Sequence, residues 1–220
     1  MTSFDSCEVY YQLHRAYDLA SSGDEFLHFG SPYEVLIATI LSAQTTDRCV
    51  NAVTKVLFAR YPDSSALAQA ESSDVEGIIH STGFYRAKAR NIIAAAQVLV
   101  NSHGGAVPDD MDLLMALPGV GRKTANIVIH HAFGRAEGIA VDTHVKRVST
   151  RLGLSDQTNP NRIEQDLLDL FPRNIWGEIN GLFILHGRRI CQARSPACDR
   201  CVLSGICRYA LARSDPISHI

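Results

Sequence analysis

Four cysteines near the carboxyl end constrain the fold more than any other feature of this 220-residue chain. Six, two and five residues separate the successive members, which are Cys191, Cys198, Cys201 and Cys207. Four thiolates from one compact loop supply every ligand of a tetrahedral Zn²⁺ site or of one [4Fe–4S] cluster. The other two cysteines, Cys7 and Cys49, lie on helix-like segments, so ligation explains the pattern better than disulfides do. The spacing leaves zinc and iron both open.

The rest of the chain predicts helices, because apolar residues recur at helical spacing and no stretch alternates with period two. Ser31 offers an N-cap before Pro32, and Glu34 completes the pattern of a capping box. Two apolar stripes are expected to face a core: Ile92, Ile93, Ala96, Leu99 and Val100 in one, and Ile163, Leu167, Leu170 and Phe171 in the other. We therefore expect an all-α protein of about ten short helices.

A Pro-Gly turn at residues 117–121 leads into an apolar-periodic run that starts at Ala125. This pattern predicts a helical hairpin. Gly119, Val120 and Gly121 would present main-chain amides at the positive end of the second helix, where a phosphate binds well. An ordinary turn between two helices has the same pattern, so the hairpin alone does not establish a binding site.

Lys123 falls in the first turn of that second helix, where the helix dipole favours a neutral, nucleophilic amine. The alternative is a solvated surface lysine. Asp142 follows nineteen residues later, at the start of another predicted helix. A carboxylate there caps the helix and also stays ionised, so it can accept a proton or offset positive charge. His144 and Arg147 come next, either as phosphate contacts or as part of a solvated basic face.

Charge and hydropathy exclude some classes of protein. The net charge of −2 gives no global sign of a nucleic-acid partner. Five arginines nevertheless gather around the cysteines, namely Arg188, Arg189, Arg194, Arg200 and Arg208. No apolar run reaches the length of a bilayer, and the first residues lack the pattern of a signal peptide. We expect a soluble, cytoplasmic protein that does not contact membranes, associated with the nucleoid if bacterial.

Taken together, these motifs resemble the endonuclease III family of the helix-hairpin-helix DNA glycosylase superfamily. The resemblance runs from about Ser31 to Cys207. The matching pieces are residues 41–47, 82–85 with 88–89, 117–126, 140–144, 185–188 and the four-cysteine loop. A hairpin with its lysine, a distant aspartate and this cysteine spacing form a specific combination.

The resemblance implies a two-domain fold. Residues 25–135 would form a six-helix barrel domain that contains the hairpin. Residues 1–24 and 136–220 would form a second domain from both chain ends, with a [4Fe–4S] cluster on the four cysteines. DNA would lie in the groove between the two domains.

The resemblance also implies an enzyme of base excision repair, a bifunctional DNA N-glycosylase and abasic-site lyase that removes oxidised pyrimidines. Lys123 would attack C1′ of the flipped nucleotide and expel the base. β-Elimination from the resulting Schiff base would cut the strand 3′ to the lesion. Asp142 would assist Lys123.

The partner implied is double-stranded DNA with a damaged base or an abasic site, bound by a monomer. Gln44, Phe84 and His144 match positions that fill the gap left by the flipped nucleotide. Gly119, Val120 and Gly121 would hold the DNA backbone, with Arg147 nearby. An aromatic residue buried in a local core is the alternative for Phe84.

Two other functions remain to be weighed. Adenine glycosylases share the hairpin, the aspartate and the cluster, but they lack a lysine at the position of Lys123. A non-catalytic DNA-binding module with a four-cysteine metal loop is the alternative from another class. Borohydride separates it from the enzyme, because only a catalytic lysine is trapped on abasic DNA as a covalent adduct.

Overall fold

The computed structural model describes residues 6–214, and every regular element among them is helical. Twelve α-helices and four short 3-10 helices occur in this described part. The prediction of an all-α protein is therefore confirmed, with slightly more helices than expected.

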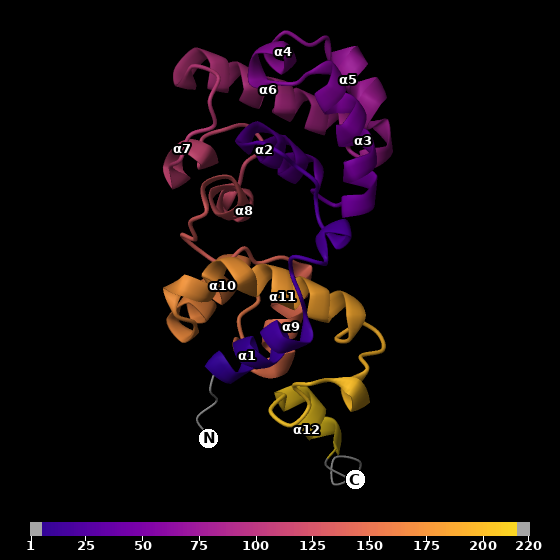
Figure 1. Cartoon of the computed structure of the whole chain (residues 1–220), viewed down its shortest axis with the longest axis vertical. Coiled ribbons are helices and arrows are strands. Elements are labelled where there is room, and N and C mark those ends of the chain that lie inside the picture. The colour runs from indigo at the N-terminus through magenta and orange to yellow at the C-terminus, as the bar shows by residue number, and fades with distance from the viewer. Residues whose placement is uncertain (1–5, 215–220) are drawn as a thin grey trace. The chain divides into compact units, whose positions relative to one another are not determined.

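The chain divides into two compact units (Figure 1). Unit 1 combines Met1–Ala20 with Gly138–Ile220, and unit 2 is Ser21–Glu137. Their assignment to a cluster domain and a six-helix barrel domain stays a prediction. The first five and last six residues assigned to the cluster domain lie outside the described part of the chain.

Unit 2 contains seven α-helices and two 3-10 helices among the described residues. They are η1 (Gly23–Glu25), α2 (Pro32–Leu41), α3 (Asp47–Arg60), α4 (Ser64–Ala68), α5 (Ser72–Ile79), η2 (His80–Thr82), α6 (Tyr85–His103), α7 (Met111–Met115) and α8 (Arg122–Phe133).

Helix α2 forms the centre of unit 2, where it packs against α3, α6 and α8 (Figure 1). It has no polar face, since eight of its residues are buried. The Ser31 hydroxyl accepts the Glu34 N–H at 3.2 Å, as the sequence predicts. The Glu34 carboxylate accepts the N–H of Gly30. Hydrogen bonds to the Ser31 hydroxyl and to the Glu34 carboxylate thus fix the start of α2.

Helix α6 packs against α4 and α5 and ends at Gly104, which has a φ of +60°. Ile92, Ala96 and Leu99 are fully buried, so most of the predicted stripe faces the core. Val100 is 36 % exposed, and its placement in the core was wrong. It lies at the margin of the buried face, one residue beyond Leu99, where 100° of helical rotation turns it outward.

Unit 1 contains five α-helices and two 3-10 helices among the described residues. They are α1 (Ser6–Ala16), α9 (Thr143–Leu152), α10 (Pro160–Leu170), η3 (Arg173–Ile175), α11 (Trp176–Arg189), η4 (Cys198–Arg200) and α12 (Arg208–Ser214).

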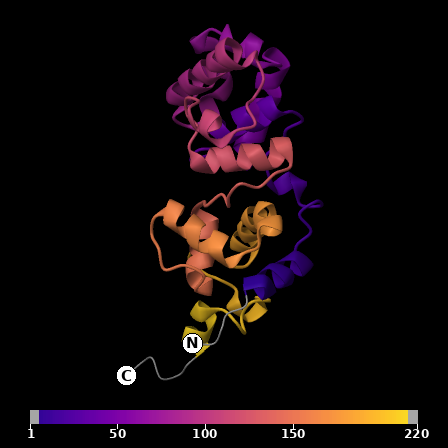
Figure 2. The same cartoon turned by 90° about the vertical axis from the view of Figure 1, so that its left-hand side faces the viewer.

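Helix α11 organises unit 1, because α1, α9 and η3 all pack against it. The first helix of the chain therefore packs against a helix from its carboxyl-terminal third, indigo beside orange in Figures 1 and 2. The Tyr10 hydroxyl donates to the Glu178 carboxylate at 3.0 Å, and the Ser6 hydroxyl donates to the carbonyl of Leu170. The Leu170 side chain is 37 % exposed, so it too was wrongly placed in the core.

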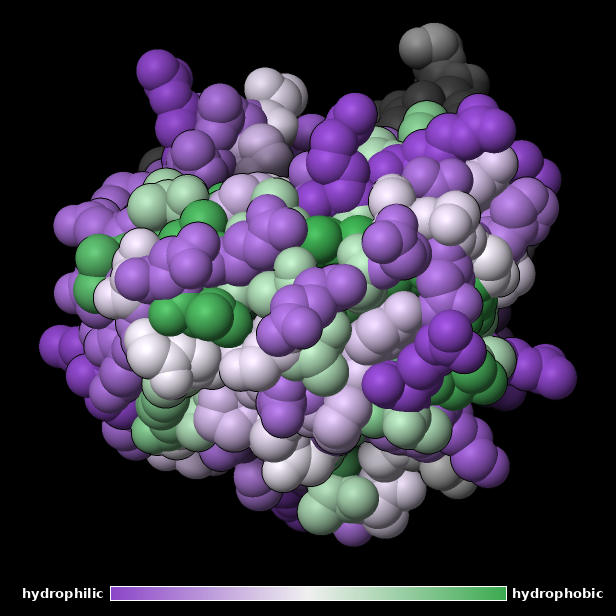
Figure 3. All heavy atoms as spheres, turned by 90° about the horizontal axis from the view of Figure 1, so that it is seen from above, coloured by the Kyte–Doolittle hydropathy of each residue, from purple (hydrophilic) through white to green (hydrophobic). Residues whose placement is uncertain are grey.

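Hydrophilic side chains cover most of the face shown in Figure 3, with hydrophobic ones scattered among them. None of the helices in residues 6–214 is both long enough and apolar enough to span a bilayer.

Candidate active site and cysteine pocket

Helices α7 and α8 pack together and form the predicted hairpin in unit 2. The Val120 N–H closes the turn by donating to the Leu117 carbonyl at 3.1 Å. Gly119 has a φ of +80°, and a Cβ at this position would lie 3.0 Å from the side chain of Asn91. Glycine is required there for both reasons. Val120 is buried and anchors the turn, whereas Gly121 is exposed.

Helix α8 starts without a side-chain cap, because its N-cap residue is Gly121. Its first intrahelical bond runs from the Ala125 N–H to the Gly121 carbonyl at 2.9 Å. The amides of the first turn lie outside the hydrogen-bond ladder of the helix, and the helix dipole adds positive potential. A Cβ on Gly121 would meet no atom within 4 Å, so the surface above it is open.

Lys123 is the second residue of α8 and is exposed. Its amine has no hydrogen bond or ion pair with any described residue. The structure therefore places an unpaired primary amine beside an uncapped helix start.

Asp142 is the N-cap of α9 in unit 1. Its Oδ1 accepts the Val145 N–H at 2.8 Å, so the predicted capping is confirmed. The other carboxylate oxygen accepts no hydrogen bond from the described residues, and Asp142 is only half-buried, which leaves room for a second role.

Gln44 and Phe84 both have left-handed backbones, with φ values of +53° and +49°. Both side chains are exposed, that of Phe84 to 69 %. The alternative of a locally buried aromatic residue is therefore wrong for Phe84. Each position lies at the start or end of a helix in unit 2, just after α2 or just before α6.

Arg147 is bound to the main chain of unit 1. Its Nε donates to the Cys191 carbonyl and its Nη2 to the Gly187 carbonyl, both at 3.0 Å. Nη2 also lies 3.0 Å from Nδ1 of His144. A Cβ on Gly187 would fall 2.8 Å from that nitrogen, so the close packing requires glycine. The roles of His144 and Arg147 in DNA binding stay predictions.

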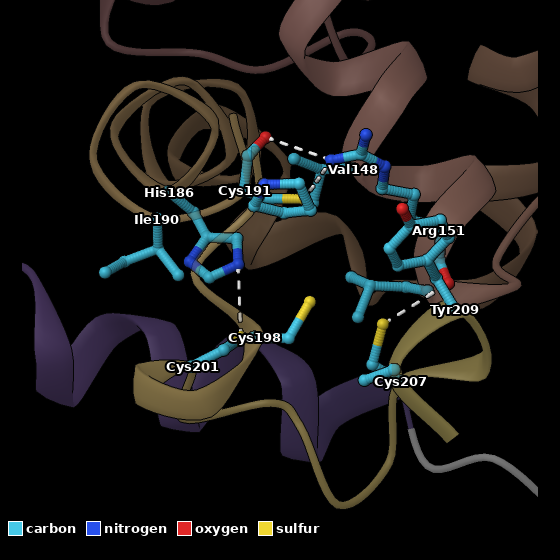
Figure 4. A pocket seen from close by; sticks show the side chains of 12 residues that line it. Val148, Arg151, His186, Ile190, Cys191, Cys198, Cys201, Cys207 and Tyr209 are labelled. Carbon is cyan, nitrogen blue, oxygen red and sulfur yellow. Dashed lines mark hydrogen bonds between the residues drawn. The ribbon is translucent and has the colours of Figure 1, made fainter. Parts of the chain in front are cut away.

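The four cysteines line one pocket in unit 1, together with aliphatic residues (Figure 4). The aliphatic part of the wall consists of Val148, Leu152, Ile190, Pro196 and Ala210. None of the four thiols is in a disulfide. In a cubane cluster each sulfur binds a different iron, so its ligands surround a volume instead of converging on one point. Sulfurs spread over the wall of a largely apolar pocket fit such a cluster.

The thiol groups also need a cationic partner. Burial raises the pKa of Cys201 to about 11, and the neighbouring thiols add to the shift. Burial likewise raises the pKa of Cys207. Four thiolates in so small a volume are stable only beside positive charge, which iron supplies. The chemistry of the donor set therefore matches an iron–sulfur cofactor.

His186 approaches the pocket with a defined orientation. Its Nε2 lies 3.6 Å from Sγ of Cys201 (Figure 4). Its Nδ1 lies 2.8 Å from the Tyr17 hydroxyl. Burial lowers the pKa of His186 to about 4 and raises that of Tyr17 to about 12, so both are neutral near pH 7. In the Nε2–H tautomer of this neutral imidazole, the tyrosine donates to Nδ1 and the imidazole directs its proton at the sulfur.

Arg151 holds the cysteine loop from α9. Its guanidinium donates to the carbonyls of Gln192 and Ala193 at 2.7 and 2.8 Å, and to Sγ of Cys191 at 3.3 Å. It also stacks on the ring of Tyr209. In the sequence Arg151 belongs to the same basic stretch as Arg147, which predicts either phosphate contacts or a solvated face, and neither predicts its contacts with the cysteine loop. Arg151 lies four residues after Arg147, on the same face of α9, and this spacing was the available sign that both contact the same loop.

Two family models match the chain. One describes the HhH-GPD superfamily base excision DNA repair proteins and matches residues 37–173, which include the hairpin. The other describes the iron-sulfur binding domain of endonuclease III and matches residues 191–207, from the first to the last pocket cysteine. The predicted [4Fe–4S] cofactor is thereby confirmed, and the zinc alternative is excluded.

Individual relatives agree with these matches. Endonuclease III of Synechocystis sp. is 51 % identical over 186 residues, which are 84 % of this chain and 85 % of the relative. Endonuclease III of Escherichia coli strain K12 is 42 % identical over 183 residues, 83 % and 86 % of the two chains. A solved structure described as a trapped endonuclease III–DNA covalent intermediate is 41 % identical, with a TM-score of 0.83 over 94 % of this chain and 98 % of that one.

The fold and the site thus define a base excision repair protein of the helix-hairpin-helix class, which acts as a DNA glycosylase. The fold predicted from the sequence is confirmed as the fold of that class. Within it, the chain belongs to the endonuclease III family.

Proposed function

We propose that the chain is a bifunctional DNA N-glycosylase and abasic-site lyase that acts on oxidised pyrimidines in double-stranded DNA. The observation that carries the proposal is the unpaired, exposed amine of Lys123 at the uncapped start of α8. A nucleophile needs a lone pair and an approach route, and this position offers the approach. Two solved structures that resemble the chain are described as complexes of endonuclease III with DNA, which supports DNA as the partner.

In this proposal Nζ of Lys123 forms a bond to C1′ of the flipped nucleotide as the bond from C1′ to the base breaks. The amine gives up a proton, which the departing base takes up. Protonation of O4′ by solvent then accompanies opening of the sugar ring, and a Schiff base results. Removal of a proton from C2′ then breaks the bond between C3′ and its oxygen, which cuts the strand 3′ to the lesion. The carboxylate of Asp142 offsets the positive charge that develops on the sugar or accepts a proton.

The direct test is borohydride reduction of the wild-type protein on a duplex with one abasic site. Reduction converts the Schiff base into a stable covalent adduct, which a denaturing gel resolves. A DNA-binding module without a catalytic lysine would bind the duplex and give no adduct.

Asp142→Asn should slow base excision by about 100-fold, within the range for loss of one acid–base group. Asparagine caps helices as well as aspartate does, so the free energy of unfolding should change by less than about 0.5 kcal/mol. Single-turnover excision and chemical denaturation measure the two effects. Asp142→Ser is a second variant with the same expected slowing, since it also keeps a capping oxygen and has no charge. An unchanged excision rate in both variants would leave Asp142 with the capping role alone.

Gly121→Val should weaken binding to a duplex with a stable abasic analogue by roughly tenfold. The added side chain would stand over the amides of α8 and block a phosphate from approaching. The fold should survive, because φ at Gly121 is −104° and a Cβ there meets no atom within 4 Å. Fluorescence anisotropy of labelled DNA measures the affinity. Wild-type affinity would show that the DNA backbone does not contact this turn.

We also propose that Cys191, Cys198, Cys201 and Cys207 are the cluster ligands. With all four irons bound by cysteine, the cluster has no site for substrate and serves structure or electron transfer. Arg147 and Arg151 donate to carbonyls of the cysteine loop, and they place positive charge beside it.

A further inference from the structure

Strained backbone marks two loops of unit 2. Gln44 and Phe84 are the only described residues other than glycine with a positive φ. Left-handed backbone is unfavourable for both residue types, and it persists only where the surroundings impose it. Both side chains are nevertheless exposed, so packing of the side chains themselves does not impose the conformation. Another group must hold these loops.

Lys88 contacts both loops. It lies one turn into α6, and its N–H donates to the Phe84 carbonyl at 3.1 Å. Its amine donates to Oγ1 of Thr45 and to the carbonyl of Thr82, both at 2.8 Å. Thr45 also donates its hydroxyl to the Thr82 carbonyl. The Lys88 ammonium group thus connects Thr45, which follows Gln44, to Thr82, which lies two residues before Phe84.

The buried position of the Lys88 amine does not favour the stability of the fold. Lys88 is only 5 % exposed, and no carboxylate among the described residues pairs with it. Burial lowers its pKa, an effect that the nearby Cys49 thiol opposes. An apolar side chain would fill the same space without a buried charge, so stability does not explain a lysine here.

We propose that Lys88 is a positioning residue that fixes the loops carrying Gln44 and Phe84 in the arrangement needed to fill the gap in a duplex. The inference rests on the proposed function, since only an enzyme that flips a nucleotide leaves such a gap. Side chains fixed before DNA arrives lose less conformational entropy on binding than mobile ones do. The lysine acts through the two loops and does not touch the reacting atoms.

Two variants remove hydrogen bonds between Lys88 and the two loops. Lys88→Met keeps the length of the side chain and removes its donor. Thr45→Val keeps its shape and removes the acceptor, and it decides the outcome if Lys88→Met fails to fold. Lys55→Met is the matched control, because Lys55 is exposed on α3.

The first measurement needs no DNA. Phe84→Trp in a Trp176→Phe background gives the full-length protein one indole, since Trp176 is its only tryptophan. Time-resolved anisotropy should show more nanosecond motion of that indole after Lys88→Met or Thr45→Val, and no change after Lys55→Met. Equal motion in all proteins would overturn the proposal.

The second measurement separates positioning from overall damage. Lys88→Met should weaken binding to a duplex with a stable abasic analogue by roughly tenfold. Borohydride trapping on single-stranded abasic DNA should stay within about twofold of wild type, because a single strand has no gap to fill. Equal losses on both substrates would show a merely structural role and overturn the proposal. If wild type forms no adduct on any substrate, the proposed lyase fails, and the anisotropy result still decides whether Lys88 holds the loops.

Discussion

Lys123→Gln should abolish the borohydride adduct on abasic DNA completely and lower base excision on the order of 10⁴-fold or more. Only a primary amine forms a Schiff base, so no other atom of the variant replaces this function. Glutamine has nearly the helix propensity of lysine, and the side chain is exposed and unpaired, so the fold should be unchanged. The measurements are denaturing gel electrophoresis after reduction and single-turnover excision.

Binding to a stable abasic analogue distinguishes lost chemistry from lost recognition. Lys123→Gln should bind this analogue within a few-fold of wild type, because the hairpin amides remain. Lys55→Gln, at another exposed lysine, should keep full trapping. Persistent trapping by Lys123→Gln would assign the nucleophile to a different amine.

Cys198→Ser should lose the iron–sulfur cluster and destabilise unit 1. Metal binding is coupled to folding when the site does not exist in the unfolded chain. A loss of about 4 kcal/mol would lower Tm by roughly 8–16 °C in a chain of this size. Iron analysis and visible absorbance report the cluster, and differential scanning calorimetry reports Tm. Cys7→Ser, on α1 and outside the pocket, is the control that keeps its iron. Full absorbance in Cys198→Ser would exclude Cys198 as a ligand.

Local sequence patterns predicted those parts of the molecule that depend on near neighbours. The hairpin follows from a Pro-Gly turn before an apolar run, and capping by Asp142 follows from its place before Val145. Periodicity also located the buried face of α6. It failed for Val100 and Leu170, which lie at the margins of such faces. An apolar stripe shows which side of a helix faces the core, but it does not show how wide the buried surface is.

The remaining features depend on contacts between distant segments. Nothing in the pattern around Lys88 shows that its amine reaches Thr45, which lies 43 residues earlier. Arg147 and Arg151 look like a solvated basic face, yet both bind carbonyls of the cysteine loop. The left-handed backbones of Gln44 and Phe84 are also invisible in sequence, since neither residue type favours that conformation.

Unit 1 is built from both ends of the chain, and this has a consequence during translation. Helix α1 leaves the ribosome before unit 2, but α11, against which it packs, follows only after all of unit 2 has been made. Domains generally fold as soon as their residues have emerged. The nascent chain should therefore complete Ser21–Glu137 while α1 still lacks its partner helix, and the full set of four cysteines is present only when synthesis has passed Cys207.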